Sequence, residues 1–325
     1  MTTPETNLLI VLSLPEPVRN IYYSRLRERF PELTINMVGH NSEAGPFIAD
    51  AGMVLAFGVM LSDEIFARGN KLQWVQALGS GVDGIVDQPS FRKDILVTNM
   101  QGIHGPPCAE AAICAMFDLS RSMPRIMANQ RNHVWERFPV RLLDGKRVAV
   151  IGLGVIAEAL GPRCQALGMH VTGVTGSPRR LAGFDAVVPR ERMLETVAQS
   201  DYVVLLTPYT KENHHLANAD FLAAMKKDAY LVNIARGGVV DEEALVAALD
   251  SRAIAGASLD VFSVEPLPED HPFWSMDNVI VTPHLGGFHD EYPKRALPIL
   301  EHNIEKFLAG DRAAMLNIVN RGKDA

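Results

Sequence analysis

Three side chains in the second half of the chain could together carry acid–base chemistry. Arg236 lies within residues 233–238, Glu265 lies within residues 256–268, and His284 follows 19 positions after the glutamate. A guanidinium group offers a planar fork of donors to a carboxylate or a polarised carbonyl. An imidazole exchanges a proton near neutral pH, and a neighbouring carboxylate fixes the ring and favours its protonated form. We therefore interpret these three residues as catalytic candidates.

A glycine-rich turn upstream could hold a dinucleotide. An apolar run leads into residues 152–157, a G-x-G-x-x-A pattern that opens a helical pattern. Gly152 permits the tight turn, Gly154 lets the backbone approach a pyrophosphate, and Ala157 allows close helix–strand contact. The N-terminus of the following helix directs free N–H groups at the phosphates.

Taken together, these segments resemble the D-isomer-specific 2-hydroxyacid dehydrogenases. The order and spacing of Arg236, Glu265 and His284 fit that family's motifs, and the similarity runs almost unbroken from about Leu142 to about Leu285. The resemblance implies hydride transfer between a nicotinamide cofactor and a small 2-keto acid, giving a D-2-hydroxy acid. His284 would protonate the keto oxygen, Arg236 would polarise that oxygen and orient the carboxylate, and Glu265 would support His284.

The loop after the second strand of the dinucleotide domain predicts the choice of cofactor. An NAD-binding chain usually places Asp or Glu at this tip, to bind the ribose 2′-hydroxyl. Thr175 stands there by resemblance, and no carboxylate follows before Asp185. Ser177, Arg179 and Arg180 supply the hydroxyl and guanidinium groups that a 2′-phosphate prefers. We expect NADP (NADPH), with NAD less favoured; a solvated basic loop is the structural alternative.

The resemblance extends the cofactor site to the ends of later strands, where ligands of open α/β sheets bind. Asp260 is expected near the nicotinamide carboxamide, with a helix or turn cap as its alternative role. The expected cofactor-binding residues are Gly152, Gly154, Val155, Ile156, Ser177, Arg179, Arg180, Thr207, Pro208, Ile234, Ala235, Arg236, Asp260, His284, Gly286 and Gly287.

A second glycine-rich segment, residues 77–84, lies near the start of the chain. Its glycines let consecutive N–H groups point into one concavity that suits an anion. By resemblance this loop grips the substrate carboxylate, whereas the alternative is a plain strand-to-helix turn. The loop carries no Lys or Arg, so the substrate is expected to be unphosphorylated. The expected substrate-binding residues are Leu78, Gly79, Ser80, Gly81 and Arg236.

Alternating apolar runs and helical patterns predict an α/β protein with two doubly wound parallel-sheet domains. By resemblance, a Rossmann dinucleotide-binding domain (101–289) is inserted into a flavodoxin-like substrate-binding domain (1–100 and 290–325). Gly161-Pro162 predicts that the first Rossmann helix is kinked or shortened. The predicted strands are 8–14, 34–38, 53–56, 72–77, 95–98, 148–151, 171–174, 186–188, 202–206, 229–234, 257–261 and 279–281, and the predicted helices are 18–30, 63–68, 106–120, 129–135 and 293–307.

Composition excludes several other classes of protein. The 325 residues are 47% hydrophobic with a net charge of −7, which argues against disorder and against broad attraction to nucleic acid. No apolar stretch approaches membrane-spanning length. The three cysteines form no C-x-x-C pair, so neither a disulfide framework nor a metal site is predicted, and a reducing cytoplasm is expected.

Assembly and alternative functions follow from the resemblance. The apolar-rich region from Pro106 through Trp135 is expected to build a twofold homodimer. One alternative is a nucleotide-sensing interaction protein of the C-terminal-binding corepressor type. Another is an amino-acid dehydrogenase or other Rossmann enzyme, which would leave the Glu265–His284 pairing unexplained.

Overall fold

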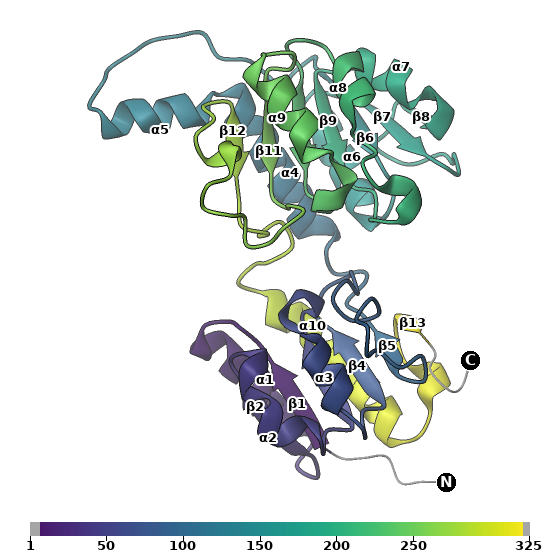
Figure 1. The fold of residues 1–325 in the computed structure, drawn as a ribbon. Coiled ribbons are helices and arrows are strands. Elements are labelled where there is room, and N and C mark those ends of the chain that lie inside the picture. Colours follow the sequence, from purple (N-terminus) through teal and green to yellow (C-terminus); the bar gives the residue numbers. More distant parts are fainter. Residues whose placement is uncertain (1–6, 321–325) are drawn as a thin grey trace. The chain divides into compact units, whose positions relative to one another are not determined.

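The computed structural model describes residues 7–320, which form two compact units (Figure 1). The first unit runs up to Ile103 and resumes at Asp290, and the second is the continuous segment His104–His289. The second unit is therefore an insertion between two parts of the first. No helix within residues 7–320 combines the length and the apolar character needed to cross a bilayer.

The first unit is built on a six-stranded sheet. Its strand order is β13-β5-β4-β3-β1-β2, and every neighbouring pair is parallel except β13 with β5. Strands β3 and β4 are buried along their whole length, as in a parallel sheet covered on both faces. The strands are β1 (Asn7–Val11), β2 (Thr34–Val38), β3 (Met53–Ala56), β4 (Trp74–Ala77), β5 (Leu96–Thr98) and β13 (Ile318–Asn320). The antiparallel edge strand β13 was not among the predicted strands.

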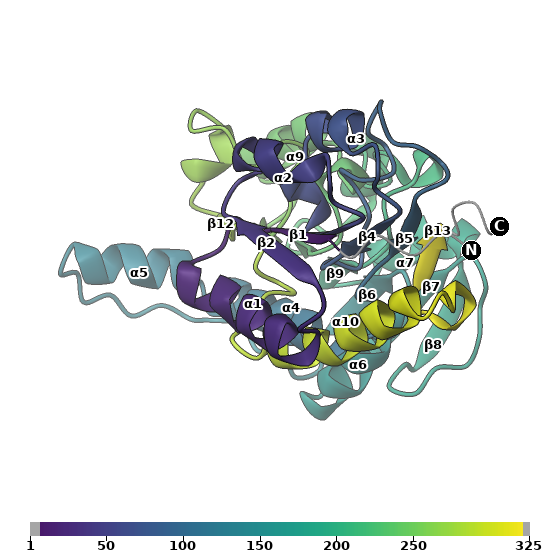
Figure 2. The same cartoon turned by 90° about the horizontal axis from the view of Figure 1, so that it is seen from below.

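Helices cover both faces of this sheet (Figure 2). On one face α1 (Glu16–Arg29) and α10 (Tyr292–Leu308) pack over Leu8 and Ile10. On the other face α2 (Gly45–Ile48) and α3 (Asp63–Arg68) pack over Leu9 and Val11. Successive residues of β1 therefore serve opposite cores, which is the doubly wound arrangement predicted from the sequence.

A buried polar chain ties α10 to the sheet of the first unit. The Trp74 indole N–H donates to the Thr98 hydroxyl (2.8 Å), which donates to Gln76 Oε1 (2.7 Å). Asn303 Nδ2, on α10, donates to the same oxygen at 2.9 Å. Each of these side chains is at most 1% exposed, so each needs its partner.

The second unit is built on a seven-stranded parallel sheet of order β12-β11-β10-β9-β6-β7-β8. The chain proceeds outward from β6 to β8, returns to β9 beside β6, and proceeds outward again to β12. This reversal is the switch point at which open α/β sheets bind ligands. The strands are β6 (Arg147–Ile151), β7 (His170–Thr175), β8 (Ala186–Pro189), β9 (Tyr202–Leu205), β10 (Tyr230–Asn233), β11 (Gly256–Leu259) and β12 (Val279–Val281). The sequence predicted all seven, with ends that differ by a few residues.

Two helices pack on one face of this sheet and three on the other. Apolar residues of α4 (Gly105–Ser120) and α6 (Val155–Ala166) share a core with Val148 and Val150. Those of α7 (Met193–Ala198), α8 (Ala219–Ala224) and α9 (Glu242–Asp250) share a core with Ala149 and Ile151. The Rossmann architecture predicted for this segment is thus confirmed.

Two predictions about these helices were wrong. The helix expected at residues 129–135 is α5 (Met123–Arg131), which starts after Ser122 in a left-handed conformation and with Pro124 in its first turn. It extends away from the sheet of its unit (Figure 1), and none of its residues is buried. The prediction at Gly161-Pro162 is wrong about the length of α6, which continues to Ala166, whereas the kink stays a prediction. A Cβ on Gly161 would lie 2.4 Å from the Phe184 ring, so glycine is needed there for packing.

Candidate active site

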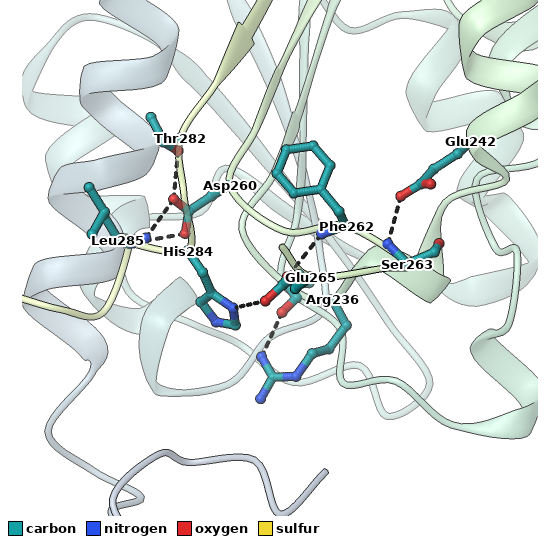
Figure 3. Close-up of polar contacts among 11 residues, drawn as sticks. Arg236, Glu242, Asp260, Phe262, Ser263, Glu265, Thr282, His284 and Leu285 are labelled. Carbon is teal, nitrogen blue, oxygen red and sulfur yellow. Dashed lines mark hydrogen bonds and ion pairs between the residues drawn. The ribbon is translucent and has the colours of Figure 1, made fainter. Parts of the chain in front are cut away.

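The three catalytic candidates come from loops that follow three adjacent strands. Arg236 follows β10, Glu265 follows β11 and His284 follows β12, and these strands are neighbours in the sheet. The carboxyl ends of parallel strands share one edge, so the three loops meet there. Figure 3 shows the three side chains gathered in one place.

His284 and Glu265 form a direct hydrogen-bonded pair. Nδ1 of His284 donates to Oε2 of Glu265 at 2.8 Å. Nε2 makes no hydrogen bond with any residue in the described range 7–320, and the side chain is 40% exposed. The backbone of His284 is left-handed, with φ 53°, which is uncommon for a residue with a side chain and is often found at functional sites. The ring is thus fixed through one nitrogen and open at the other.

Glu265 is held in place by more than the histidine. Its Oε1 accepts the backbone N–H of Phe262 at 3.0 Å, and the adjacent Ser263 N–H donates to Glu242 Oε1, on α9, at 2.7 Å. Burial acts to raise the pKa of Glu265. The hydrogen bonds from His284 and Phe262 outweigh that effect, and with the nearby positive charges they lower this pKa below its ordinary value. The carboxylate is therefore ionised at neutral pH.

Asp260 holds the loop that carries His284 (Figure 3). Its Oδ1 accepts the Leu285 N–H (2.8 Å) and the Thr282 hydroxyl (2.5 Å), and its Oδ2 accepts the Gly286 N–H (2.8 Å). Its backbone oxygen accepts the His284 N–H at 2.9 Å. The carboxylate is 5% exposed and acts as a turn cap, the alternative role considered for it. Its contact with a nicotinamide stays a prediction.

Arg236 is placed by a buried asparagine that the sequence analysis missed. Asn233 is 1% exposed; its Nδ2 donates to Arg236 O (3.1 Å) and its Oδ1 accepts the Ala235 N–H (3.1 Å). Nη1 of Arg236 donates to Ala235 O at 2.7 Å. A Cβ on Gly237 would lie 1.9 Å from the Phe262 carbonyl carbon, so this loop packs directly on the loop of Glu265. A polar residue closing an apolar strand was the available signal for Asn233.

The glycine turn has the geometry that a dinucleotide requires. Gly152 has φ 98°, and a Cβ there would lie 2.7 Å from Thr207 N, so a side chain is excluded. Gly154 caps α6 and has open space where a Cβ would be. A cavity of about 180 Å³ adjoins the turn and is lined by Ile151, Gly152, Leu153, Val174, Thr175, Gly176, Arg190, Met193, Thr207, Pro208, Asn213 and Leu216. The backbone thus fits a dinucleotide phosphate.

Among the lining residues that the sequence analysis missed, Arg190 and Asn213 form a polar pair. Nη2 of Arg190 donates to Asn213 Oδ1 at 2.6 Å. Asn213 in turn donates to the Thr207 hydroxyl (3.1 Å) and to Pro208 O (2.9 Å). They fix the segment that holds two of the predicted cofactor residues. No sequence pattern connects residues so far apart with the glycine turn.

The predicted 2′-phosphate loop is exposed, and its two arginines differ. Nη2 of Arg179 donates to Glu158 Oε1, on α6, at 2.7 Å, and to Leu153 O at 3.3 Å. Arg180 has no hydrogen bond or ion pair with any other residue of the described segment 7–320, and it shares with Arg179 the lining of a shallow cavity of about 420 Å³. Ser177 N–H donates to the Thr175 hydroxyl at 3.4 Å.

The expected substrate-binding loop belongs to the first unit. Ser80 O accepts Asn99 Nδ2 at 2.6 Å, Gly79 O accepts the Met100 N–H at 3.0 Å, and Leu78 O accepts the Tyr292 hydroxyl. Within the range 7–320, the N–H groups of Gly79, Ser80 and Gly81 donate to no protein acceptor. The carbonyl oxygens of this loop thus already accept hydrogen bonds, whereas its consecutive N–H groups are available to an anion. Consecutive N–H groups of this kind form the backbone nest that binds anions.

Known proteins resemble this chain in sequence and in fold. Residues 113–286 match the family model described as "D-isomer specific 2-hydroxyacid dehydrogenase, NAD binding domain". The D-3-phosphoglycerate dehydrogenase of Methanocaldococcus jannaschii is 34% identical over 82% of this chain and 51% of its own length. The glyoxylate reductase of Korarchaeum cryptofilum is 31% identical over 79% of each chain. The chain thus spans about half the length of the phosphoglycerate dehydrogenase and most of the glyoxylate reductase.

Solved structures match the whole chain. A D-isomer specific 2-hydroxyacid dehydrogenase family protein from Aeromonas salmonicida superposes with a TM-score of 0.85 at 31% identity, covering 98% of this chain and 99% of that one. A D-isomer specific 2-hydroxyacid dehydrogenase from Xanthobacter autotrophicus, crystallised with NADPH and MES, gives 0.80 at 32% identity, covering 98% of each.

Proposed function

This chain belongs to the D-isomer specific 2-hydroxyacid dehydrogenase family, and on that premise we propose that it reduces a small unphosphorylated 2-keto acid with NADPH. The substrate would be of the glyoxylate or hydroxypyruvate type, and the product the D-2-hydroxy acid. The observation that carries the proposal is the 2.8 Å pair of His284 and Glu265 beside Arg236, at the edge of the sheet that also holds the glycine turn.

The residues of this chain would divide the chemistry in a definite way. A nicotinamide, when bound, would supply the hydride that reduces the keto carbon. His284 holds a proton at Nε2, because Nδ1 is bound to Glu265, and gives it to the keto oxygen. Arg236 binds the substrate carboxylate and polarises the keto group. Glu265 stays ionised and keeps the imidazole oriented through its hydrogen bond to Nδ1.

The proposal of an unphosphorylated substrate rests on the loop at residues 77–84. It offers free N–H groups for one carboxylate but no Lys or Arg for a phosphate as well. The likeness to a glyoxylate reductase supports this choice. The likeness to phosphoglycerate dehydrogenases favours a second candidate, the oxidation of 3-phosphoglycerate. Glyoxylate, hydroxypyruvate and 3-phosphoglycerate assayed in the matching directions with both cofactors decide between them, and turnover of 3-phosphoglycerate alone would contradict the proposal.

The proposed preference for NADP rests on three side chains and on the lack of a carboxylate at the tip of β7. Ser177, Arg179 and Arg180 follow β7, and no carboxylate stands at its tip, where Thr175 lies. A related enzyme of known structure binds NADPH. NAD would be used less well, since its 2′-hydroxyl finds no carboxylate there. Equal kcat/KM with both cofactors would refute the preference.

Two further proposals concern the protein as a whole. The exposed helix α5 and Trp135, which is 93% exposed, suit burial against a second copy in a homodimer; a monomer by light scattering would contradict this. The free thiols of Cys108, Cys114 and Cys164 suit a reducing compartment.

A corepressor-like interaction protein remains the alternative to an enzyme, and turnover of NADPH with a keto acid would exclude it.

A further inference from the structure

Arg179, which we assign to the 2′-phosphate, is already bound by a carboxylate of its own chain. Its Nη2 lies 2.7 Å from Glu158 Oε1 and 3.3 Å from the carbonyl oxygen of Leu153. Leu153 is the central residue of the glycine turn, and Glu158 is in the first turn of α6. The guanidinium therefore lies across the turn at which the cofactor phosphates are expected.

We propose that Glu158 limits the preference for NADPH by competing with the 2′-phosphate of that cofactor for Arg179. Both are anions that use the same guanidinium donors. NADPH must therefore displace Glu158 or share Arg179 with it, whereas NADH makes no such demand. The inference rests on the proposed NADP preference and deepens it, because it names a residue that limits that preference.

The neighbouring Arg180 shows why the competition by Glu158 affects only the contact between Arg179 and the 2′-phosphate. Arg180 has no protein partner within residues 7–320, so its donors are available to a phosphate without any exchange. Within residues 7–320, Arg179 is the one partner of the Glu158 side chain, which is 46% exposed while that of Arg179 is 51% exposed. An ion pair this open to water contributes little to stability, so a ligand can break it at low cost.

The size of the effect follows from this exposure. Exposed pairs of this kind are worth up to about 1 kcal/mol, which corresponds to roughly a fivefold change in an equilibrium constant. Glu158→Gln should therefore tighten NADPH binding by about two- to fivefold and leave NADH binding within about twofold. The same selectivity should appear for 2′,5′-ADP over 5′-AMP, which probe only the adenosine half.

A double-mutant cycle tests whether Glu158 acts through Arg179. Dissociation constants for both cofactors are measured for the wild type, Glu158→Gln, Arg179→Ala and the double variant. The gain in NADPH binding from Glu158→Gln should disappear in the Arg179→Ala background. Glu195→Gln is the matched control, because Glu195 is a similarly exposed partner of Arg192 (2.6 Å) on α7, and it should change neither dissociation constant.

Each outcome assigns the failure to one proposal. A Glu158→Gln variant with unchanged or weaker NADPH binding overturns the competition, and so does a gain that persists without Arg179. The NADP preference survives both results, provided that Arg179→Ala alone weakens NADPH more than NADH. Equal loss of both cofactors in Arg179→Ala instead overturns the assignment of the 2′-phosphate loop, and the competition with it.

Discussion

Two of the ion pairs in the second unit have almost equal lengths but very different settings. His284 and Glu265 are 2.8 Å apart, and Arg179 and Glu158 are 2.7 Å apart. Glu265 has a backbone N–H on its other oxygen, and Asp260 holds the loop of its partner. Arg179 and Glu158 are side chains about half exposed to water. The first arrangement is fixed before substrate arrives, whereas the second can exchange with a ligand.

The two settings match the two roles that we propose, proton donation for the fixed pair and discrimination between cofactors for the exposed pair. A proton donor must be positioned before the transition state, because reorganisation at that moment would add to the barrier. A residue that distinguishes two cofactors needs only a difference in binding free energy, which an exposed and replaceable contact can supply. Distance alone would not have distinguished the two pairs.

The largest expected effect comes from removing the proton donor. His284→Ala should lower kcat for keto-acid reduction by about 10²- to 10⁴-fold, the usual contribution of a positioned acid. NADPH binding should stay nearly unchanged, since the imidazole, held by Glu265, would act on the substrate and not on the adenosine half of the cofactor. Steady-state kinetics and a fluorescence titration of NADPH measure the two quantities. A fall of less than tenfold in kcat would remove His284 from the chemical step.

Arg236→Lys should have the next largest effect. Lysine keeps the charge but loses the planar fork, so it cannot serve carboxylate and keto group together. Loss of one charge-assisted hydrogen bond costs about 1.5–3 kcal/mol, which predicts a fall in kcat/KM of roughly 10- to 150-fold through a higher KM and a lower kcat. Unchanged kinetics in a folded variant would place Arg236 outside the active site.

Asp260→Asn sharpens the comparison through stability. The amide would leave the half-buried N–H of Leu285 or the buried N–H of Gly286 facing an NH2 group, at a cost of about 1–3 kcal/mol. We expect a lower melting temperature together with a lower kcat, because the loop of His284 loses its clamp. Glu158→Gln, in the exposed pair, should melt with the wild type. Equal melting of both variants would show that Asp260 does not hold this loop.

Several parts of the fold and site could be predicted because they depend on local pattern. Apolar runs give the seven strands of the second unit, and the G-x-G-x-x-A turn has one backbone geometry that suits it. The pairing of Glu265 with His284 follows from their loops leaving adjacent strands. The resemblance supplied the motif, and the sheet order supplies its physical reason.

Other parts depend on contacts that no local pattern encodes. Strand β13 is short and has no buried residue, and it forms only by pairing antiparallel with β5, which lies far from it in the sequence. Helix α5 also has no buried residue, so its limits left no periodic signal. Glu158 and Arg179 are 21 positions apart on a helix and a loop, and only the tertiary structure shows them as partners.

The smallest expected effect comes from removing the charge of Glu265. In Glu265→Gln the amide oxygen can still accept the Nδ1 hydrogen, but no carboxylate favours the imidazolium. Reduction requires a protonated imidazole, so the descending limb of the kcat profile should move to lower pH. An unmoved profile, with a melting temperature below that of the wild type, would make this carboxylate structural only.

Stability against acid gives an independent measure of the same charge. The pKa of Glu265 is lowered in the folded protein. The ionised carboxylate therefore stabilises the fold at any pH above the ordinary pKa of a glutamate, and this stabilisation is lost as the pH falls through the lowered pKa of the folded state. The melting temperatures of wild type and Glu265→Gln should therefore differ most near neutral pH and converge in acid. Glu158→Gln should follow the wild type at every pH, because no stabilising charge is buried with it. If the difference in melting temperature between wild type and Glu265→Gln widened on acidification, Glu265 would be protonated more readily in the folded than in the unfolded chain. The Glu265–His284 pair would then no longer differ from the exposed Glu158–Arg179 pair by having a carboxylate that folding keeps ionised.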